Sequence, residues 1–263
     1  MPNLRLTCLF IALFFSINAY AQKTHDWMQE DYLISSFLDI ALNNEYSVSQ
    51  SKLRKWTQPI KYHFLHRTAD KQLHERLATL HLKNLQKITG VKMQQIQHKQ
   101  NANLLIIFSK EALLEKELLK EFNISSKKQR EQLFRNSVCL AHFSINKNNS
   151  IRKAIVIIPV DRARAKAKLV SCIVEELTQI MGLPNDSDKV YPSIFNDRST
   201  DELLSGLDFI LLKMLYHPKL KAGMPMAQIK RLLPSIIKEF NQQKLIQNAT
   251  VEASRSGLYE LLY

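Results

Sequence analysis

The sequence contains few glycines, few cysteines and only one long run of apolar residues. Among its 263 residues there are 5 Gly, 8 Pro and 3 Cys, a balance that excludes collagen-like repeats and low-complexity tracts. Hydrophobic residues make up 45% and charged residues 23%, which excludes a disordered chain and predicts a packed core. No linker rich in Pro, Gly or Ser and no internal repeat is visible, so we expect one compact domain with a small N-terminal appendage.

The one long apolar run lies close to the first residue. Arg5 is followed by apolar residues 6–17 and then by the small-residue segment Ala19–Ala21, a layout typical of a signal peptide cleaved after that segment. The run is too short to span a bilayer, and Cys8 lies too far upstream of the cleavage site to be a lipidated cysteine. We therefore expect an exported protein, periplasmic or extracellular, whose mature chain begins at Gln22.

The predicted mature chain keeps two cysteines, Cys139 and Cys172. Thiols are oxidised in the compartments that exported proteins enter, so the simplest expectation is a disulfide bond between the two. The alternative is a thiol nucleophile with His142 as its base, which the oxidising compartment disfavours.

Positive charge is in excess, with 37 Lys and Arg against 24 Asp and Glu and a formal net charge of +13. Such a surplus could bind an anionic component of the cell envelope. The basic residues are, however, spread from Lys52 to Arg255 and mixed with Glu, which favours a solvated basic surface. Export and the lack of a nucleic-acid motif argue against nucleic acid as a partner.

Periodicity and turn chemistry predict an α+β fold. Helices are expected over 27–42, 70–88 with a stop at Gly90, 111–134, 161–181 with Asp161 as N-cap and Gly182 as stop, 199–216 with a capping box at Ser199–Glu202, and 225–240 with a bend at Pro234. Strands are expected over 56–65, 91–97, 104–108, 139–145 and 154–160, the last two forming an antiparallel hairpin around the turn 146–150. The expected order is strand, helix, strand, strand, hairpin, helix.

Two carboxylates and an amide lie on one face of the helix predicted over 161–181. At about 100° per residue, Cys172, Glu175, Glu176 and Gln179 share that face, and apolar residues cover most of the other. From periodicity alone, an exposed polar stripe on an amphipathic helix is the favoured interpretation.

The spacing in this segment supports a second interpretation. Glu175, Glu176, Gln179, Gly182 and Asn185 occur in a pattern that resembles the metzincin zinc peptidases, HExxHxxGxxH, with every histidine replaced. The resemblance implies that Glu176 occupies the general-base position and that Glu175, Gln179 and Asn185 occupy the ligand positions. In addition, residues 191–196 resemble the metzincin turn that carries a Met beneath the metal, and residues 203–216, which include Asp208, resemble the closing helix.

The donor types present do not suit a zinc ion well. Zinc prefers imidazole or carboxylate ligands, whereas Gln179 and Asn185 offer amide oxygens. Calcium or magnesium accepts oxygen donors more readily, and Asp186 and Asp188 lie close in sequence. None of the eight histidines stands at a ligand position of the motif.

A structural alternative is a polar network that ties the helix to the following turn. Glu175, Gln179 and Asn185 would then hydrogen-bond among themselves and to that turn. The turn consists of Ser193, Ile194, Phe195, Asn196 and Asp197. A domain of this kind could still bind an extended peptide by strand addition to a sheet edge.

The chain more closely resembles an uncharacterised family of exported bacterial proteins, a domain of unknown function. The shared pattern is Phe37, Ile40, Ala41, Glu45, Tyr46, Trp56, Pro59, Ile60, Cys139, Cys172, Glu175, Glu176, Gln179, Gly182, Leu183, Asn185, Asp186, the turn 193–197, Leu215, Tyr216, Gly223 and Met224. This resemblance covers nearly the whole mature chain and implies a domain type without an activity.

Together these features predict a zincin-like or metzincin-like α+β domain with a mixed twisted sheet, two long helices and a helical C-terminal subdomain. The expected parts are a signal peptide (1–21), a helical appendage (22–50), the zincin-like domain (51–224) and a C-terminal helix and tail (225–263). The expected function is binding of a peptide or an envelope component without catalytic zinc. One alternative is a metal-dependent hydrolase with Glu176 as base and Glu175, Gln179, Asn185 and Asp186 holding zinc or another divalent ion. The other is a basic protein that binds the cell envelope.

Overall fold

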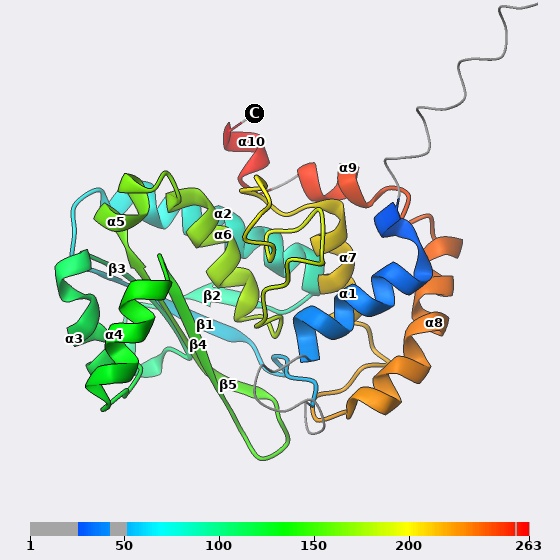
Figure 1. The fold of residues 1–263 in the computed structure, drawn as a ribbon, viewed down its shortest axis with the longest axis horizontal. Coiled ribbons are helices and arrows are strands. Elements are labelled where there is room, and N and C mark those ends of the chain that lie inside the picture. Colours follow the sequence, from blue (N-terminus) through cyan, green and yellow to red (C-terminus); the bar gives the residue numbers. More distant parts are fainter. Residues whose placement is uncertain (1–25, 43–51, 256, 263) are drawn as a thin grey trace, which may run out of the picture.

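A five-stranded mixed sheet forms one half of the molecule, and helices form the other half (Figure 1). The computed structural model describes residues 26–42, 52–255 and 257–262. The predicted signal peptide, residues 1–21, lies outside the described residues, as do Glu45 and Tyr46 of the family pattern. Within the described part of the chain, no helix is both long and apolar enough to cross a bilayer.

The strands are β1 (Ile60–His66), β2 (Met93–Gln95), β3 (Leu104–Ser109), β4 (Leu140–Ile145) and β5 (Ile151–Pro159), in the spatial order β2-β1-β3-β5-β4. All neighbouring pairs are parallel except β4 and β5. The predicted hairpin is therefore confirmed, and the apolar run 104–108 occupies the middle of the sheet, as expected for a strand buried on both faces. β1 begins four residues later than predicted, after Pro59, which has no N–H to give to a ladder.

Each face of the sheet contacts a separate apolar cluster. Alternate residues of the central strands, such as Ile106 and Val156, face the large cluster, which also contains apolar residues of the first long helix and the helix after β5. Their neighbours Ile107 and Ile157 face a small cluster covered by Leu114 and nearby residues. This alternation follows from the period of two along a strand.

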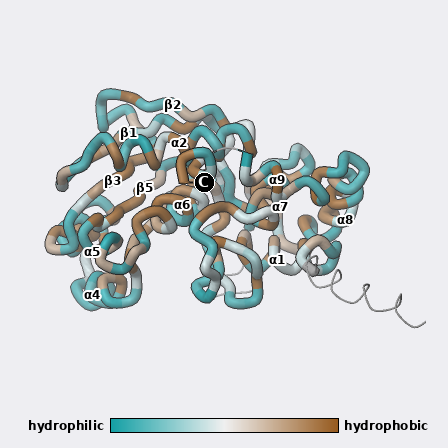
Figure 2. The backbone as a smooth tube through the Cα atoms, turned by 90° about the horizontal axis from the view of Figure 1, so that it is seen from above, coloured by the Kyte–Doolittle hydropathy of each residue, from teal (hydrophilic) through white to brown (hydrophobic). Residues whose placement is uncertain are grey.

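The helices are η1 (Asp26–Met28), α1 (Glu30–Leu42), α2 (Lys71–Thr89), η2 (Lys99–Asn101), η3 (Glu111–Leu113), α3 (Leu114–Lys120), α4 (Lys127–Asn136), α5 (Val160–Ala165), α6 (Leu169–Gln179), α7 (Gly206–Leu215), α8 (Met226–Gln242), α9 (Ala249–Ser254) and α10 (Tyr259–Leu262). Helices α2 and α6 lie together beside the sheet, and α1, α7, α8 and α9 form the other half (Figures 1 and 2). Helices α9 and α10 follow the last helix that the sequence predicted.

Two helices predicted as continuous are each divided in two. The helix predicted over 161–181 is interrupted between α5 and α6, where Ala167 adopts a left-handed backbone with φ of 53°. The N-cap of its first part is Pro159, and the carboxylate of Asp161 instead accepts the backbone N–H of Glu111 at 2.8 Å. The helix predicted over 111–134 is interrupted between α3 and α4, where Asn123 has φ of 56°. Periodicity does not detect such breaks because the segment on each side of the break has helical spacing of its own.

The capping box predicted at Ser199–Glu202 is wrong. Helix α7 begins at Gly206, and the residues that form its capping box are Ser205 and Asp208. Asp208 lies within an apolar helix and is fully buried, so its carboxylate gains more from capping than the exposed Glu202 does.

Candidate functional site

The C-terminal end of α6 and the loop after it form the candidate site. Two side chains from distant segments hold this end in place. The indole N–H of Trp56 donates to the carbonyl of Ile180 at 2.8 Å, and the hydroxyl of Tyr216 donates to the carbonyl of Met181 at 2.8 Å. Carbonyls that have no partner within the helix therefore receive side-chain donors, which fixes the direction in which the chain leaves α6.

Gly182 makes the turn that leads out of α6. Its φ is +115°, a backbone conformation that favours glycine, and a Cβ atom at this position would overlap the carbonyl oxygen of Arg54. The positive φ and the close approach of Arg54 therefore explain why glycine occupies position 182, without any role for a metal ion.

A buried histidine joins α6 to α2. The ring Nε2 of His81 lies 2.9 Å from the hydroxyl of Thr178, which itself donates to the carbonyl of Val174 at 2.6 Å. Burial lowers the pKa of His81 to about 3, so its ring is neutral at physiological pH. This histidine packs the two helices together.

Glu175 and Glu176 lie in an acidic environment. Glu176 is only 6% exposed, which corrects the expectation of a fully exposed polar stripe, and Glu175 is half-buried. Burial, together with the charges of Asp186 and Asp197, raises the pKa of Glu175 to about 8. Burial and the charges of Glu175 and Asp186 hold the pKa of Glu176 well above its ordinary value. Burial and these neighbouring charges therefore disfavour the ionised form of Glu176.

Gln179 contacts the loop after α6. Its side-chain amide nitrogen donates to the carboxylate of Asp186 at 2.9 Å. Asp186 also lies close enough to Glu175 and Glu176 to raise the pKa of both. Four of the residues singled out from the sequence are thus brought together on one side of α6.

Asn185 points elsewhere. Its side-chain nitrogen donates to the carbonyls of Ile40 at 3.1 Å and Asp39 at 3.3 Å, and its backbone N–H also donates to Ile40. The side chain therefore caps the C-terminal end of α1. The network expected among Glu175, Gln179 and Asn185 does not include Asn185.

The turn 193–197 is anchored to α7 by Asp208. One carboxylate oxygen of Asp208 accepts the hydroxyl of Ser193 at 2.6 Å, and the other accepts the backbone N–H groups of Ile194 at 3.2 Å and Ser205 at 2.8 Å. Burial raises the pKa of Asp208 to about 6, although these hydrogen bonds oppose the shift. The sequence signal for this anchor was Ser205 followed three residues later by an acid and then by an apolar run.

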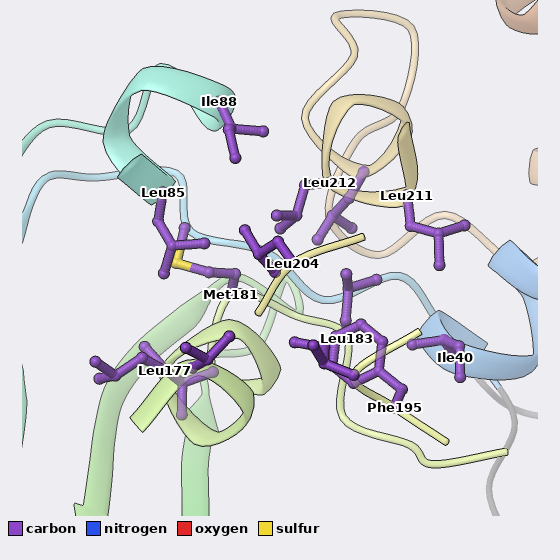
Figure 3. Packing of buried hydrophobic residues seen from close by; sticks show 14 of the residues in the cluster. Ile40, Leu85, Ile88, Leu177, Met181, Leu183, Phe195, Leu204, Leu211 and Leu212 are labelled. Carbon is purple, nitrogen blue, oxygen red and sulfur yellow. The ribbon is translucent and has the colours of Figure 1, made fainter. Parts of the chain in front are cut away.

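Phe195, which the expected metzincin resemblance would align with a Met, is fully buried. It belongs to the same apolar cluster as Leu183, Ile40 of α1, and Leu211 and Leu212 of α7 (Figure 3). The carbonyl of Phe195 also accepts the backbone N–H of Ser187 at 2.8 Å, which joins the turn to the loop after α6. The turn therefore packs beneath that loop as part of the core.

Lys55 is a buried cation that the sequence analysis did not identify. Its ammonium group donates to the carbonyls of Leu215 at 2.9 Å and Leu220 at 2.8 Å, and it lies 5.2 Å from the centre of the Tyr216 ring. Burial lowers its pKa to about 8, with a smaller contribution from Lys221. Lys55 thus caps the end of α7, close to the tyrosine that holds α6.

Cys139 and Cys172 form a disulfide bond with 5.8 Å between their Cα atoms. The predicted bond is confirmed, and the alternative of a thiol nucleophile with His142 is wrong because neither sulfur is free. The bond joins the residue before β4 to α6, about one helical turn before Glu175 and Glu176. It therefore fixes the edge strand to the helix that carries the acidic pair.

The donor set does not fit a zinc ion. Of the four residues expected to ligate, Gln179 and Asn185 carry amides that already donate to Asp186 and to α1. Glu175 and Asp186 are the two carboxylates among the four. Within the part of the chain that the structure describes, no group of three His, Cys, Asp or Glu side chains is arranged to hold a metal ion.

Comparison with curated proteins finds no match. A family model does match, from residue 30 to residue 235, which includes the sheet, the acidic pair on α6, the turn 193–197 and helix α7. The chain therefore belongs to the family described as "Protein of unknown function (DUF2927)".

Proposed function

We propose that this protein is an exported, zincin-like binding module that holds an extended peptide along strand β4 without a catalytic zinc ion. The observation that carries the proposal is the outer edge of β4. This strand has one neighbour in the sheet, β5, and no other described segment makes a backbone hydrogen bond to it. An edge of this kind presents a row of N–H and C=O groups that a peptide strand can pair with.

The topology supports the zincin relationship. The observed order of elements is strand, helix, strand, strand, hairpin and helix, given by β1, α2, β2, β3, β4–β5 and α5–α6. That is the order that the resemblance to metzincins implies. Glu175 and Glu176 also lie on the helix after the hairpin, followed by a turn that packs beneath the loop, as the resemblance implies.

The chemistry of the acidic pair favours binding over hydrolysis. A general base must be ionised, and burial together with the charges of Glu175 and Asp186 raises the pKa of Glu176, which disfavours its ionised form. The amides of Gln179 and Asn185 are weak zinc ligands. The alternative of a metal-dependent hydrolase therefore receives less support from these residues than a peptide-binding role does.

The test begins with peptides selected from a random-sequence display library on the mature chain. A selected peptide is then synthesised with N-methyl groups on alternate amides. Strand pairing predicts that methylation of one alternate set weakens binding at least tenfold, because those N–H groups donate to β4, while methylation of the other set has little effect. Backbone hydrogen exchange should slow in residues 140–145 when the peptide binds, and residues 93–95 of the opposite edge serve as the control.

Two results would contradict the proposal. Equal losses for both methylated sets, with unchanged exchange in β4, would show that the peptide does not pair with this edge. Cleavage of the peptide by the parent protein, abolished in Glu176→Gln, would replace the proposal with the hydrolase alternative. Chelators are expected to leave the peptide affinity unchanged.

A further inference from the structure

Exposed basic residues outnumber acids on and around helix α8. The segment 217–248 contains six exposed basic residues and one acid: Lys219, Lys221, Lys230, Arg231, Lys238 and Lys244 against Glu239. On α4, by contrast, an exposed lysine has an acidic partner, since Lys127 lies 3.8 Å from Glu131. The spread of charge along the sequence therefore conceals a local concentration in the C-terminal helical region.

Helical geometry places three of these cations in one stripe. At about 100° per residue, Lys230, Arg231 and Lys238 fall within a sector of roughly 100°. Most of the buried residues of α8, such as Ile229 and Ile236, lie outside this sector. The exposed residues 227–241 on this side of the helix span about 21 Å at 1.5 Å per residue.

No described acidic side chain lies within ion-pair distance of this stripe. Lys230, Arg231 and Lys238 form no ion pair with any described residue. The acid on the helix, Glu239, lies on its flank, where it faces Lys219 and His217 at 3.4 Å each. Three positive charges are thus presented to solvent together.

The position of α8 makes the stripe accessible. The helix lies at the margin of the molecule, opposite the sheet, in both views (Figures 1 and 2). The exposed side of α8 carries no large exposed apolar side chain. The stripe is therefore suited to electrostatic contact with a charged surface and not to insertion of apolar side chains into a membrane.

From this convex, basic helix face we infer a docking surface for the anionic headgroups of a phospholipid bilayer. A planar array of phosphates can approach all three cations of a convex helix at once. A single polyanion chain would need a groove. The hollow beside α8, lined by Pro234, Ser235 and Lys238, also contains Glu30 of α1, whose carboxylate would repel a polyanion in it.

The test measures co-sedimentation of the mature chain with vesicles. Binding is expected to vesicles that contain phosphatidylglycerol and not to vesicles of phosphatidylcholine alone, and to fall steeply as salt rises. The triple variant K230Q, R231Q and K238Q should lose about 100-fold in partition. That loss corresponds to about 1 kcal/mol for each charge at the membrane surface.

A matched variant separates this face from net charge. K116Q, K127Q and K128Q remove three exposed lysines from α3 and α4 and leave the α8 stripe intact. This control should bind like the parent. Equal losses in both variants, unchanged binding in the α8 variant, or binding to soluble polyphosphate with no binding to vesicles would each overturn the inference. The peptide-binding proposal is tested on β4, so the two can fail separately.

Discussion

The carboxyl groups of Asp208, Glu175 and Glu176 are buried or half-buried. Their neighbours stabilise the ionised form of the first and destabilise that of the other two. Asp208 accepts hydrogen bonds from Ser193 and from two backbone N–H groups, which offset part of the cost of burial. Glu175 instead experiences the charges of Asp186 and Asp197, opposed in part by Lys168. Glu176 experiences the charges of Glu175 and Asp186. The acidic pair is therefore the part of the site whose charge opposes folding.

Glu175 is expected to make the protein less stable at alkaline pH. Its pKa is raised from 4.5 in the unfolded chain to about 8 in the folded one, so the folded state binds more protons. The stabilisation linked to Glu175 is complete below about pH 4.5 and is lost as pH rises through about 8. Glu175→Gln should raise the free energy of unfolding above pH 8 relative to the parent, measured by urea denaturation.

A pH series with a control variant checks this prediction. Glu202→Gln removes an exposed glutamate and should follow the parent at every pH. If Glu175→Gln also follows the parent, with the same alkaline loss, the interaction among the carboxyl groups is not responsible for the pH dependence.

At the scale of elements, two glycines that both have positive φ differ in their surroundings. A Cβ atom on Gly182 would overlap Arg54, whereas one on Gly90 meets no atom within 4 Å. Gly182→Ala should cost about 3 kcal/mol or more, since backbone strain and the overlap add. Gly90→Ala should cost about 1 kcal/mol, for strain alone. Thermal and urea unfolding of both variants measure the difference, and equal costs would show that the chain at residue 54 moves aside.

The sequence predicted the type of most elements and misplaced several of their ends. Apolar periodicity located α2, β3 and the β4–β5 hairpin, because one face or both faces of each are buried. Periodicity did not detect the breaks at Asn123 and Ala167, where the backbone turns left-handed between two segments that each have helical spacing. The capping box was predicted at Ser199–Glu202 and not at Ser205 and Asp208. The burial that favours Asp208 as the capping acid depends on packing of the whole helix.

On the scale of the whole molecule, α1 is part of the core. Phe37 and Ile40 are fully buried, and α1 contacts both α7 and α8. Asn185 further caps α1 from the loop after α6. Helix α1 and the candidate site are therefore expected to unfold together.

Phe37→Ala tests this expectation. The cavity should lower the free energy of unfolding of the whole domain by about 3 to 5 kcal/mol in one cooperative transition. Ser35→Ala, exposed on the same helix, should change it by less than about 0.5 kcal/mol. If α1 were an independent appendage, the main transition of the Phe37 variant would match the parent, as followed by near-ultraviolet circular dichroism and urea denaturation.

Residue type and local spacing were enough to predict the disulfide, the order of strands and helices, and the segments that make up the site. How the site residues face one another could be learned only from the folded chain. There Asn185 is turned toward α1, Asp186 lies beside Gln179 and Glu176 is buried. These outcomes depend on contacts between segments far apart in the chain, whose energies no local pattern contains.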